Sequence, residues 1–267
     1  MKKSSVSFLA KSLGLAFLFT VMVFSLSFGK APKREYYEIK IYHVSTQSQQ
    51  ERVHKYLKDA LLPALHKIGI TKVGVFKPVE SDTANGKLIY LLIPFKSVDQ
   101  HLELPELLLK DSEYLSAGAE YLDAAFDNAP YNRIESIFLK AFAKFPESKV
   151  PNLTTPHAER IYEFRSYESA TEKIHLNKVQ MFNDGGEVNL FERLEFNPVF
   201  FAQVISGSHM PNLMYMTSFN NKAAREAHWD VFKTHPDWKK MSGLKEYQKN
   251  VSHSDILFLH PTDYSDL

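Results

Sequence analysis

The chain is built from one sequence unit written twice. A six-residue pattern, YEIKIY at 37–42, returns 125 positions later as YEFRSY at 162–167. A second apolar pattern, LIYLLIPF at 88–95, is answered by LMYMTSF at 213–219. Matches that keep the same order with only one-residue slips indicate a duplication. Any fold for this chain must therefore accommodate two copies of one unit.

Each copy predicts the same order of elements. The first strand of each copy alternates apolar and polar residues, and the helix that follows in the first copy has an apolar stripe at helical spacing. Two strands, a second helical region and a last strand complete the order β-α-β-β-α-β, which is the ferredoxin-like unit. After its opening strand, the first copy is predicted to have a helix with an apolar stripe of Val53, Leu57, Leu61, Ala64 and Ile68. Two strands at 72–79 and 87–95, a helical region at 97–125 and a strand at 132–138 follow. After its own opening strand and helix, the second copy is predicted to have strands at 199–206 and 213–219, a helical region at 221–251 and a strand at 255–260.

The first helix of each copy carries the same two local signals. A capping box, SQQE at 48–51 and SATE at 169–172, predicts where each helix begins. Pro63 in the first copy and Gly185-Gly186 in the second predict an interruption in the middle of the helix.

A sheet of this type covers one face with its own helices and leaves the other face in need of cover. The second copy can supply that cover. We therefore predict an α+β fold in which two fused ferredoxin-like β-α-β-β-α-β halves form a dimeric-type α/β barrel within one chain. The first half spans 34–145, a linker with three prolines spans 146–157, and the second half spans 158–265.

The first 29 residues predict an export signal. Residues 1–11 contain three lysines and no acid, and residues 12–29 form an uncharged, mostly apolar run that ends in small residues. This order of basic, apolar and small residues is typical of a cleaved secretory signal peptide. The alternative is a retained anchor, because the run is just long enough to span a membrane. We expect cleavage, no stable membrane span afterwards, and a periplasmic or secreted protein.

Composition excludes several classes of function. The chain has no cysteine, which excludes disulfides, thiolate metal sites and a cysteine nucleophile. Its 32 basic and 31 acidic residues give a net charge of +1. A balance so close to neutral argues against non-specific binding of nucleic acid. We expect no nucleic-acid partner.

The second half resembles the NIPSNAP family, within the broader group of dimeric α/β barrels. The resemblance rests on YEFRSY at 162–167, FNNKAAR at 219–225 and HPDW at 235–238, and it covers about 159–259. In the first half Tyr114 stands in place of the family's tryptophan, and His101 lies near the position of its helix arginine. The resemblance implies the fold and a ligand-binding or interaction role, without an agreed catalytic motif. Wider relatives include cofactor-free monooxygenases and haem-binding proteins.

The polar face of the first strand in each half is the candidate site. We expect its side chains to project into the space between the two sheets, where an unpaired charge costs several kcal/mol. One interpretation is an ion-pair network that joins the halves. The other is a cavity whose basic residues hold an anionic head group and whose tyrosines orient it. The candidate ligand-binding residues are Glu38, Lys40, Tyr42, Glu163, Arg165 and Tyr167, together with His228 from the last helical region.

Histidines raise the question of a metal or haem. Glu51-x-x-His54 and Glu172-x-x-His175 each place a carboxylate and an imidazole on one helical face, which resembles half of a di-iron site. Helix capping already explains both glutamates, so we expect no metal site. His228 could ligate haem, but such a histidine more often packs or caps. We expect no cofactor and keep haem as the alternative.

These observations predict an exported module that binds a small apolar or anionic ligand, or a protein partner, with a cavity between the two sheets. Two alternatives remain open. The first is an enzyme of the same barrel type, either a cofactor-free monooxygenase or a haem-dependent oxidase, for which Tyr42, Tyr167 and His228 are the residues to test. The second is a purely structural scaffold. Catalytic residues cannot be assigned from the sequence.

Overall fold

The computed structural model describes residues 33–267. The predicted signal peptide and its cleavage site lie outside the described residues. Within 33–267, no helix combines the length and the apolar character that crossing a membrane would require.

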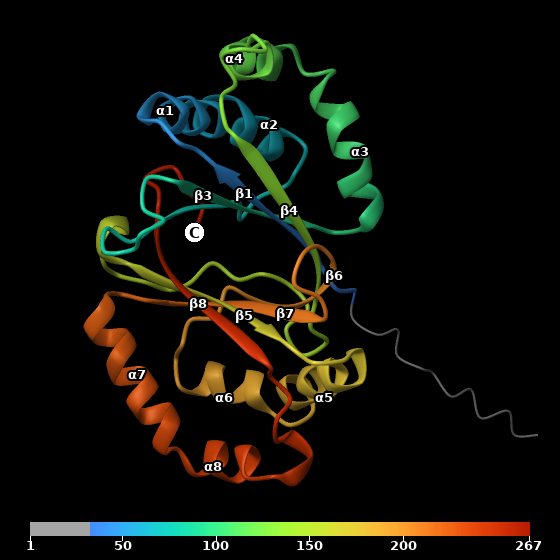
Figure 1. Cartoon of the computed structure of the whole chain (residues 1–267), viewed down its shortest axis with the longest axis vertical. Coiled ribbons are helices and arrows are strands. Elements are labelled where there is room, and N and C mark those ends of the chain that lie inside the picture. The colour runs from blue at the N-terminus through green and yellow to red at the C-terminus, as the bar shows by residue number, and fades with distance from the viewer. Residues whose placement is uncertain (1–32) are drawn as a thin grey trace, which may run out of the picture. The chain divides into compact units, whose positions relative to one another are not determined.

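The structure confirms the predicted order of elements in both halves (Figure 1). The first half contains β1 (Tyr36–His43), α1 (Gln47–Tyr56), η1 (Leu57–Leu61), α2 (Leu62–Lys67), β2 (Gly74–Pro78), β3 (Leu88–Phe95), α3 (Val98–Leu108), α4 (Ser112–Leu122) and β4 (Arg133–Ala141). The second half contains η2 (His157–Glu159), β5 (Ile161–Glu168), α5 (Glu172–Asn183), α6 (Glu187–Arg193), β6 (Phe200–Ser206), β7 (Asn212–Phe219), α7 (Lys222–Thr234), α8 (Pro236–Ser242), η3 (Lys245–Tyr247) and β8 (His253–Pro261).

The eight strands close into one barrel in the order β1-β3-β2-β8-β5-β7-β6-β4. Each half contributes four neighbouring strands, and two seams join the halves. At one seam β2 pairs with β8, and at the other β4 pairs with β6. Figure 1 shows the helices of each half on the outside of its own strands. The predicted barrel of two fused ferredoxin-like halves is confirmed.

The direction of the strands defines two ends of the barrel. Every neighbouring pair is antiparallel, so β1 and β5, which are four places apart in the closed order, run the same way. Both strands therefore end at the same opening, at His43 and Glu168. We call this opening the C-terminal mouth. It also receives the starts of β4 and β8.

The barrel interior is filled by large side chains. Tyr37 and Tyr162 come from the starts of β1 and β5, and their rings pack against Phe200 and Phe76 with centroids 5.2 and 4.9 Å apart. Ile39, Phe164, Leu92 and Met216 belong to the same buried cluster. The cavity among these side chains has a volume of about 10 Å³, room for about one water molecule. Our prediction of a ligand cavity between the two sheets is therefore wrong for the described residues.

Two further apolar layers lie between the sheets and the helices. In the first half, four members of the predicted helical stripe, Val53, Leu57, Leu61 and Ala64, are buried against the outer face of β2 and β3. The fifth, Ile68, is 37% exposed because the helix ends there. In the second half, an aromatic layer packs under α5–α8, including Phe182, Phe191, Phe201, Tyr215 and Trp229.

The ends and breaks of the first helices refine the predictions. Thr46 and Thr171 cap the helices, accepting hydrogen bonds from the backbone N–H of Gln49 (3.1 Å) and Ile174 (3.3 Å). The sequence predicted Ser48 and Ser169 as the caps instead. Ser48 lies two positions after the observed cap Thr46, and Ser169 lies two positions before the observed cap Thr171. Both breaks lie where predicted.

The two breaks differ in geometry. Before Pro63 the helix widens into the π-helical turn η1, because proline has no N–H to continue the regular ladder. In the second half, α5 ends at Asn183 and Gly186 adopts a left-handed φ of 93° that starts α6 in a new direction.

Candidate functional site

The polar residues of β1 and β5 face the helices and not the barrel interior. On β5, Glu163, Arg165 and Tyr167 contact side chains of α7 and β7, whereas Tyr162 and Phe164 lie in the interior cluster. The alternation along the strand was predicted correctly, but the faces were assigned the wrong way round. The physical reason is that the second sheet covers the apolar face, while the polar side chains find hydrogen-bond partners on the helix side.

Glu163 is the centre of a buried polar cluster in the second half. Its carboxylate is fully buried and accepts a hydrogen bond from Arg165 Nε (2.7 Å), two from Arg225 (Nε 2.9 Å and Nη2 2.8 Å) and one from the indole Nε1 of Trp229 (2.7 Å). Burial raises the pKa of the Glu163 carboxyl, but the hydrogen bond from Arg225 and the charges of both arginines outweigh it and leave the pKa lowered. We call Glu163, Arg165, Arg225 and Trp229 the Glu163 cluster.

Arg165 is held by several side chains of its own half. Its Nη1 donates to the Tyr167 hydroxyl at 2.8 Å, and that hydroxyl lies 3.0 Å from the hydroxyl of Tyr215. The guanidinium also stacks over the Trp229 ring, 4.0 Å from its centroid. All these partners belong to the second half. The cluster is therefore a hydrogen-bonded network within the second half, and it does not join the two halves.

The corresponding residues of the first half form a looser arrangement. Glu38 accepts a hydrogen bond from Ser136 Oγ at 2.7 Å, and its oxygens lie 3.8 Å from Lys40 Nζ and 3.5 Å from His101 Nε2. Tyr42 is buried in the helix-side core, where its ring makes an edge contact with Tyr131. We call Glu38, Lys40, Ser136 and His101 the Glu38 cluster.

The structure does not fit a haem at His228. The Nδ1 atom of His228 lies 2.8 Å from the carbonyl oxygen of Leu194, and its ring packs against Phe196 and Phe219. His228 borders a surface groove of about 470 Å³. Side chains such as Lys149 and others that can hydrogen-bond line that groove, whereas a haem requires a flat apolar slot beside its axial ligand. The ring is explained by packing and one hydrogen bond.

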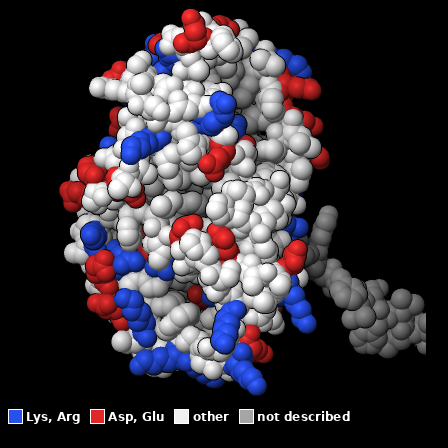
Figure 2. Space-filling model, viewed as in Figure 1, with Lys and Arg blue, Asp and Glu red and all other residues white. Residues whose placement is uncertain are grey.

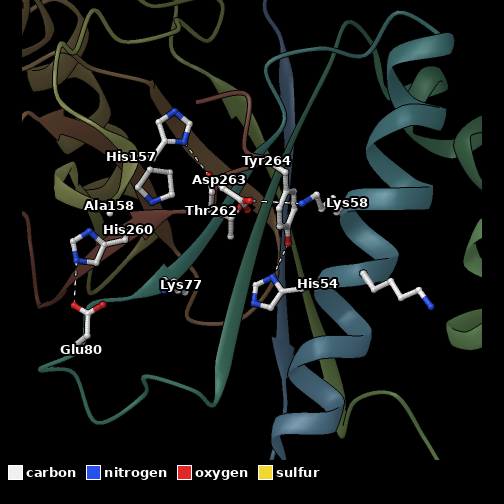
Figure 3. Close-up of a pocket in the computed structure, with 12 residues that line it drawn as sticks. His54, Lys58, Lys77, Glu80, His157, Ala158, His260, Thr262, Asp263 and Tyr264 are labelled. Carbon is white, nitrogen blue, oxygen red and sulfur yellow. Dashed lines mark hydrogen bonds and ion pairs between the residues drawn. The ribbon is translucent and has the colours of Figure 1, made fainter.

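A pocket of about 520 Å³ lies at the seam where β2 meets β8 (Figure 3). Helix α1, the turn η1, both seam strands and the chain after β8 contribute to its walls. We call it the seam pocket. Its lining residues are His54, Lys55, Lys58, Lys77, Glu80, His157, Ala158, His260, Pro261, Thr262, Asp263 and Tyr264.

Basic groups outnumber acidic groups in the seam pocket. Lys77 on β2 lies opposite His260 on β8 in the strand register, and within the described residues no carboxylate lies within 4 Å of its ammonium. Lys58 Nζ lies 3.6 Å from Asp263, and His260 Nε2 lies 3.4 Å from Glu80. The pocket therefore presents at least one basic side chain without an ionic partner.

His54 and Tyr264 form a hydrogen-bonded pair at the centre of Figure 3, with His54 Nδ1 2.6 Å from the Tyr264 hydroxyl. Burial lowers the pKa of His54, and the charge of Lys77 lowers it further, against a smaller opposing effect of Asp263. Burial also raises the pKa of the Tyr264 hydroxyl, which keeps its proton. The pair is thus neutral at neutral pH and lies beside positive charge.

The other two histidines of the pocket have one ring nitrogen fixed. His157 Nδ1 lies 3.0 Å from the carbonyl oxygen of Thr262, and His260 Nδ1 lies 2.9 Å from that of Arg160. A carbonyl oxygen only accepts hydrogen bonds, so both Nδ1 atoms carry hydrogen. The Thr262 hydroxyl oxygen is buried without a hydrogen-bond partner in the structure.

Sequence reasoning missed the seam pocket because its residues come from four separate segments of the chain. His54 and Lys58 lie one turn apart on the same stretch of helix, which was the only local signal available. Tyr264 belongs to the chain after the last strand. That chain returns along β2, where Thr262 N donates to the Val75 carbonyl oxygen at 2.9 Å.

Comparison with known proteins confirms the resemblance predicted for the second half. Residues 162–266 match the model of the NIPSNAP family. No curated protein matches the chain. The family match covers the second half, and the first half carries the same order of elements.

Solved structures with the same fold cover most of the chain. A protein from Lactobacillus acidophilus NCFM, named provisionally as a monooxygenase, is 13% identical with a TM-score of 0.58 over 85% of this chain and 94% of its own. One from Fusobacterium nucleatum, named in the same provisional way, is 8% identical with a TM-score of 0.53 over 86% and 93%. An anthrone oxidase-like protein is 10% identical with a TM-score of 0.51 over 87% and 93%. These likenesses show the fold alone.

Proposed function

We propose that this is an exported binding protein that holds a small anionic molecule in the seam pocket. The observation that carries the proposal is the basic lining of that pocket, in which Lys77 has no carboxylate within 4 Å among the described residues and Lys58 is a second lysine of the same lining. A cleft of this size with a few converging polar groups is typical of small-molecule sites. An anion there would neutralise the excess of positive charge.

The walls also suggest the shape of the ligand. Tyr264 and Pro261 supply apolar surface, and Lys58 Nζ lies 5.9 Å from the centroid of the Tyr264 ring. The charge of Lys77 acts on His54, and His54 contacts the Tyr264 hydroxyl. A carboxylate or phosphate held by Lys77 would therefore leave the rest of the molecule against the tyrosine ring. The preferred ligand is therefore a carboxylate or phosphate that carries a small apolar or aromatic part.

Binding of such an anion should strengthen as the pH falls. The pKa of His54 is lowered in the folded protein by burial first and then by the charge of Lys77. A bound anion offsets that positive charge and raises the pKa of His54 again, so binding and protonation favour each other. The affinity measured at pH 6 should exceed that at pH 8.

The experiment is calorimetric titration of the purified protein with benzoate and with inorganic phosphate, which separates aromatic carboxylates from simple phosphate. Lys77→Ala should weaken binding at least about tenfold, since it removes the basic group that lacks an ionic partner. Lys96→Ala, a charge loss at an exposed position outside the pocket, is the matched control and should bind like the parent. Binding that is absent, or that Lys77→Ala leaves unchanged, would contradict the proposal.

Export rests on the pattern of residues 1–29. Cell fractionation followed by N-terminal sequencing tests it directly. A mature chain that starts near Lys30 in the periplasmic fraction would support it, and an intact N-terminus in the cytoplasm would contradict it.

The fold neighbours named as monooxygenases do not extend that activity to this chain. Fold likeness at 8–13% identity carries no chemistry by itself. Within the described residues, the barrel interior has a cavity of about 10 Å³ between aromatic and aliphatic side chains, which is too small for an organic substrate. A binding role at the seam is the better supported function.

A further inference from the structure

A compact group of donor side chains lies at the C-terminal mouth of the barrel, away from the seam pocket. Glu168, His253 and Asp255 each offer one ligand atom, and these atoms all lie within 4.8 Å of one another. Glu168 at the end of β5 lies directly opposite His253 in the register of β8. Asp255, two residues further on, projects from the same face as His253. Strand pairing therefore brings the three donors together.

A fourth donor reaches the group from the turn between β6 and β7. His209 Nδ1 lies 2.9 Å from Glu168 Oε1, and the residue adopts a left-handed φ of 60°. The start of β7 is tied to β5 by a buried hydrogen bond in which Asn212 Nδ2 donates to Ser166 Oγ at 2.8 Å. The turn that carries His209 is thus anchored beside Glu168.

The two carboxylates lack a permanent cation. Among the described residues, the ion pairs of Glu168 and Asp255 are made with histidines, to His209 at 2.9 Å and to His253 at 3.2 Å, and none is made with lysine or arginine. Surface carboxylates that lie this close together repel each other unless a cation lies between them. Two carboxylates and two imidazoles are a donor set that suits zinc and similar divalent metals.

We propose that Glu168, His253 and Asp255, with His209 as the fourth ligand, form a binding site for Zn²⁺ at the C-terminal mouth. In tetrahedral zinc with bonds near 2.0–2.1 Å, neighbouring ligand atoms lie about 3.3 Å apart. The distances of 2.9 Å between His209 and Glu168 and 3.2 Å between His253 and Asp255 are close to that edge. The side chains of His209, His253 and Asp255 are 64%, 59% and 53% exposed, which leaves them room to rotate toward a shared ion. His209, which contacts Glu168, would have to turn toward the other two donors. The proposal is independent of the seam pocket.

The first half shows what the same position looks like without a metal site. His43 at the end of β1 corresponds to Glu168, and its Nε2 lies 2.7 Å from Glu135 on β4. Arg133 stands opposite His43 in the register, where His253 stands opposite Glu168. Arginine stays protonated and cannot ligate a metal. The duplication therefore provides a matched internal control within the same molecule.

The test is titration of the EDTA-treated, dialysed protein with zinc chloride, followed by calorimetry, using a purification tag without histidine. We expect one zinc ion per chain. His253→Ala and the isosteric Asp255→Asn should each weaken zinc binding at least about tenfold. His43→Ala, which removes the histidine of the first-half counterpart, should leave it unchanged. X-ray absorption at the zinc edge should report mixed nitrogen and oxygen ligands.

The result can also overturn the proposal. Absence of zinc binding, or equal losses in His253→Ala and His43→Ala, would show that the group is an ordinary set of surface ion pairs. Both substituted histidines are at least partly exposed, and thermal melting of each variant without metal checks that the fold is kept. Asp255→Asn preserves the shape of the side chain and keeps the test decisive if His253→Ala melts early.

Discussion

The Glu163 cluster and the Glu38 cluster occupy corresponding positions in the two halves and are built in different ways. Glu163 accepts four hydrogen bonds, from Arg165, Arg225 and Trp229, at 2.7–2.9 Å. Glu38 accepts one, from Ser136 at 2.7 Å, with basic groups at 3.5 and 3.8 Å. Duplication kept the carboxylate in both halves, while its partners diverged.

The divergence can be followed along the equivalent helices α3 and α7. Their capping residues are Ser97 and Asn221. Four residues after each cap stand His101 and Arg225, and eight residues after stand Pro105 and Trp229. The helix that covers Glu38 therefore lacks both of the donors that α7 supplies to Glu163. His101 instead packs its ring between Phe95 and Phe138.

The difference shows that the contribution of a buried charge to stability depends on its hydrogen-bond and ion-pair partners. A buried carboxylate with several donors is costly to disturb, because removing it leaves the donors unpaired. A carboxylate whose partners can reach water loses less when it is removed. The second half should therefore be far more sensitive than the first to substitutions at equivalent positions.

The largest contrast is expected from removing the two carboxylates. Glu163→Ala leaves two arginines and an indole N–H buried without their acceptor and should lower the free energy of unfolding by about 3–5 kcal/mol. Glu38→Ala should cost about 1 kcal/mol, since Lys40 is partly exposed and can hydrate. Denaturant unfolding followed by circular dichroism measures both. Equal costs would show that the partners do not set the energy.

A smaller effect of the same kind is expected from acid. The pKa of Glu163 is lowered in the folded protein, because the hydrogen bond and charges of the arginines outweigh the effect of burial, which by itself raises it. A carboxyl with a lowered folded pKa adds stability above its unfolded pKa, near 4.5, and loses it as the pH falls through the folded value. The free energy of unfolding should fall less steeply below pH 4.5 in Glu163→Gln than in the parent. Parallel pH profiles for the two proteins would contradict the assignment.

Exchanging Arg225 of α7 and His101 of α3 tests whether this one partner residue accounts for the difference in stability between the two clusters. Arg225→His removes two hydrogen bonds to Glu163 and should cost about 2 kcal/mol. The reciprocal His101→Arg should change stability by no more than about 0.5 kcal/mol, because a new ion pair to Glu38 is offset by the lost contacts with Phe95 and Phe138. Midpoints of urea unfolding compare the two variants. A gain of 2 kcal/mol in His101→Arg would mean that the first half lacks nothing but the arginine.

The repeat and the alternation of residues were sufficient to predict the strand order and the barrel. They could not predict which face of β1 and β5 lies inside, because both faces of these strands are buried. Tyr37 in the interior and Tyr42 under the helices are 0% and 2% exposed. Polarity then shows only that a side chain has partners, and not in which layer those partners lie.

The pairing register of the strands was the second feature that the sequence could not predict. The aligned patterns at 88–95 and 213–219 suggest that Tyr90 corresponds to Tyr215. In the structure Tyr90 lies opposite Ile41 and Tyr215 lies opposite Arg165, so the two tyrosines point to different faces. A slip of one residue moves a side chain from one face of a sheet to the other. The seam pocket and the donor group at the mouth were out of reach for a related reason, since each is assembled from segments far apart in the chain.

Effects of opposite sign are expected where α7 has Trp229 and α3 has Pro105. Trp229→Phe keeps an aromatic ring in the core but removes the 2.7 Å hydrogen bond to Glu163, and it should cost about 1.5 kcal/mol. Pro105→Ala restores a backbone N–H inside α3 at an exposed position and should stabilise the protein by about 1 kcal/mol. Thermal and denaturant unfolding of both variants measures these changes in stability. If Pro105→Ala destabilised the protein, the proline would be fitted to the first half as closely as the tryptophan is to the second, and the two clusters would differ in kind and not only in strength.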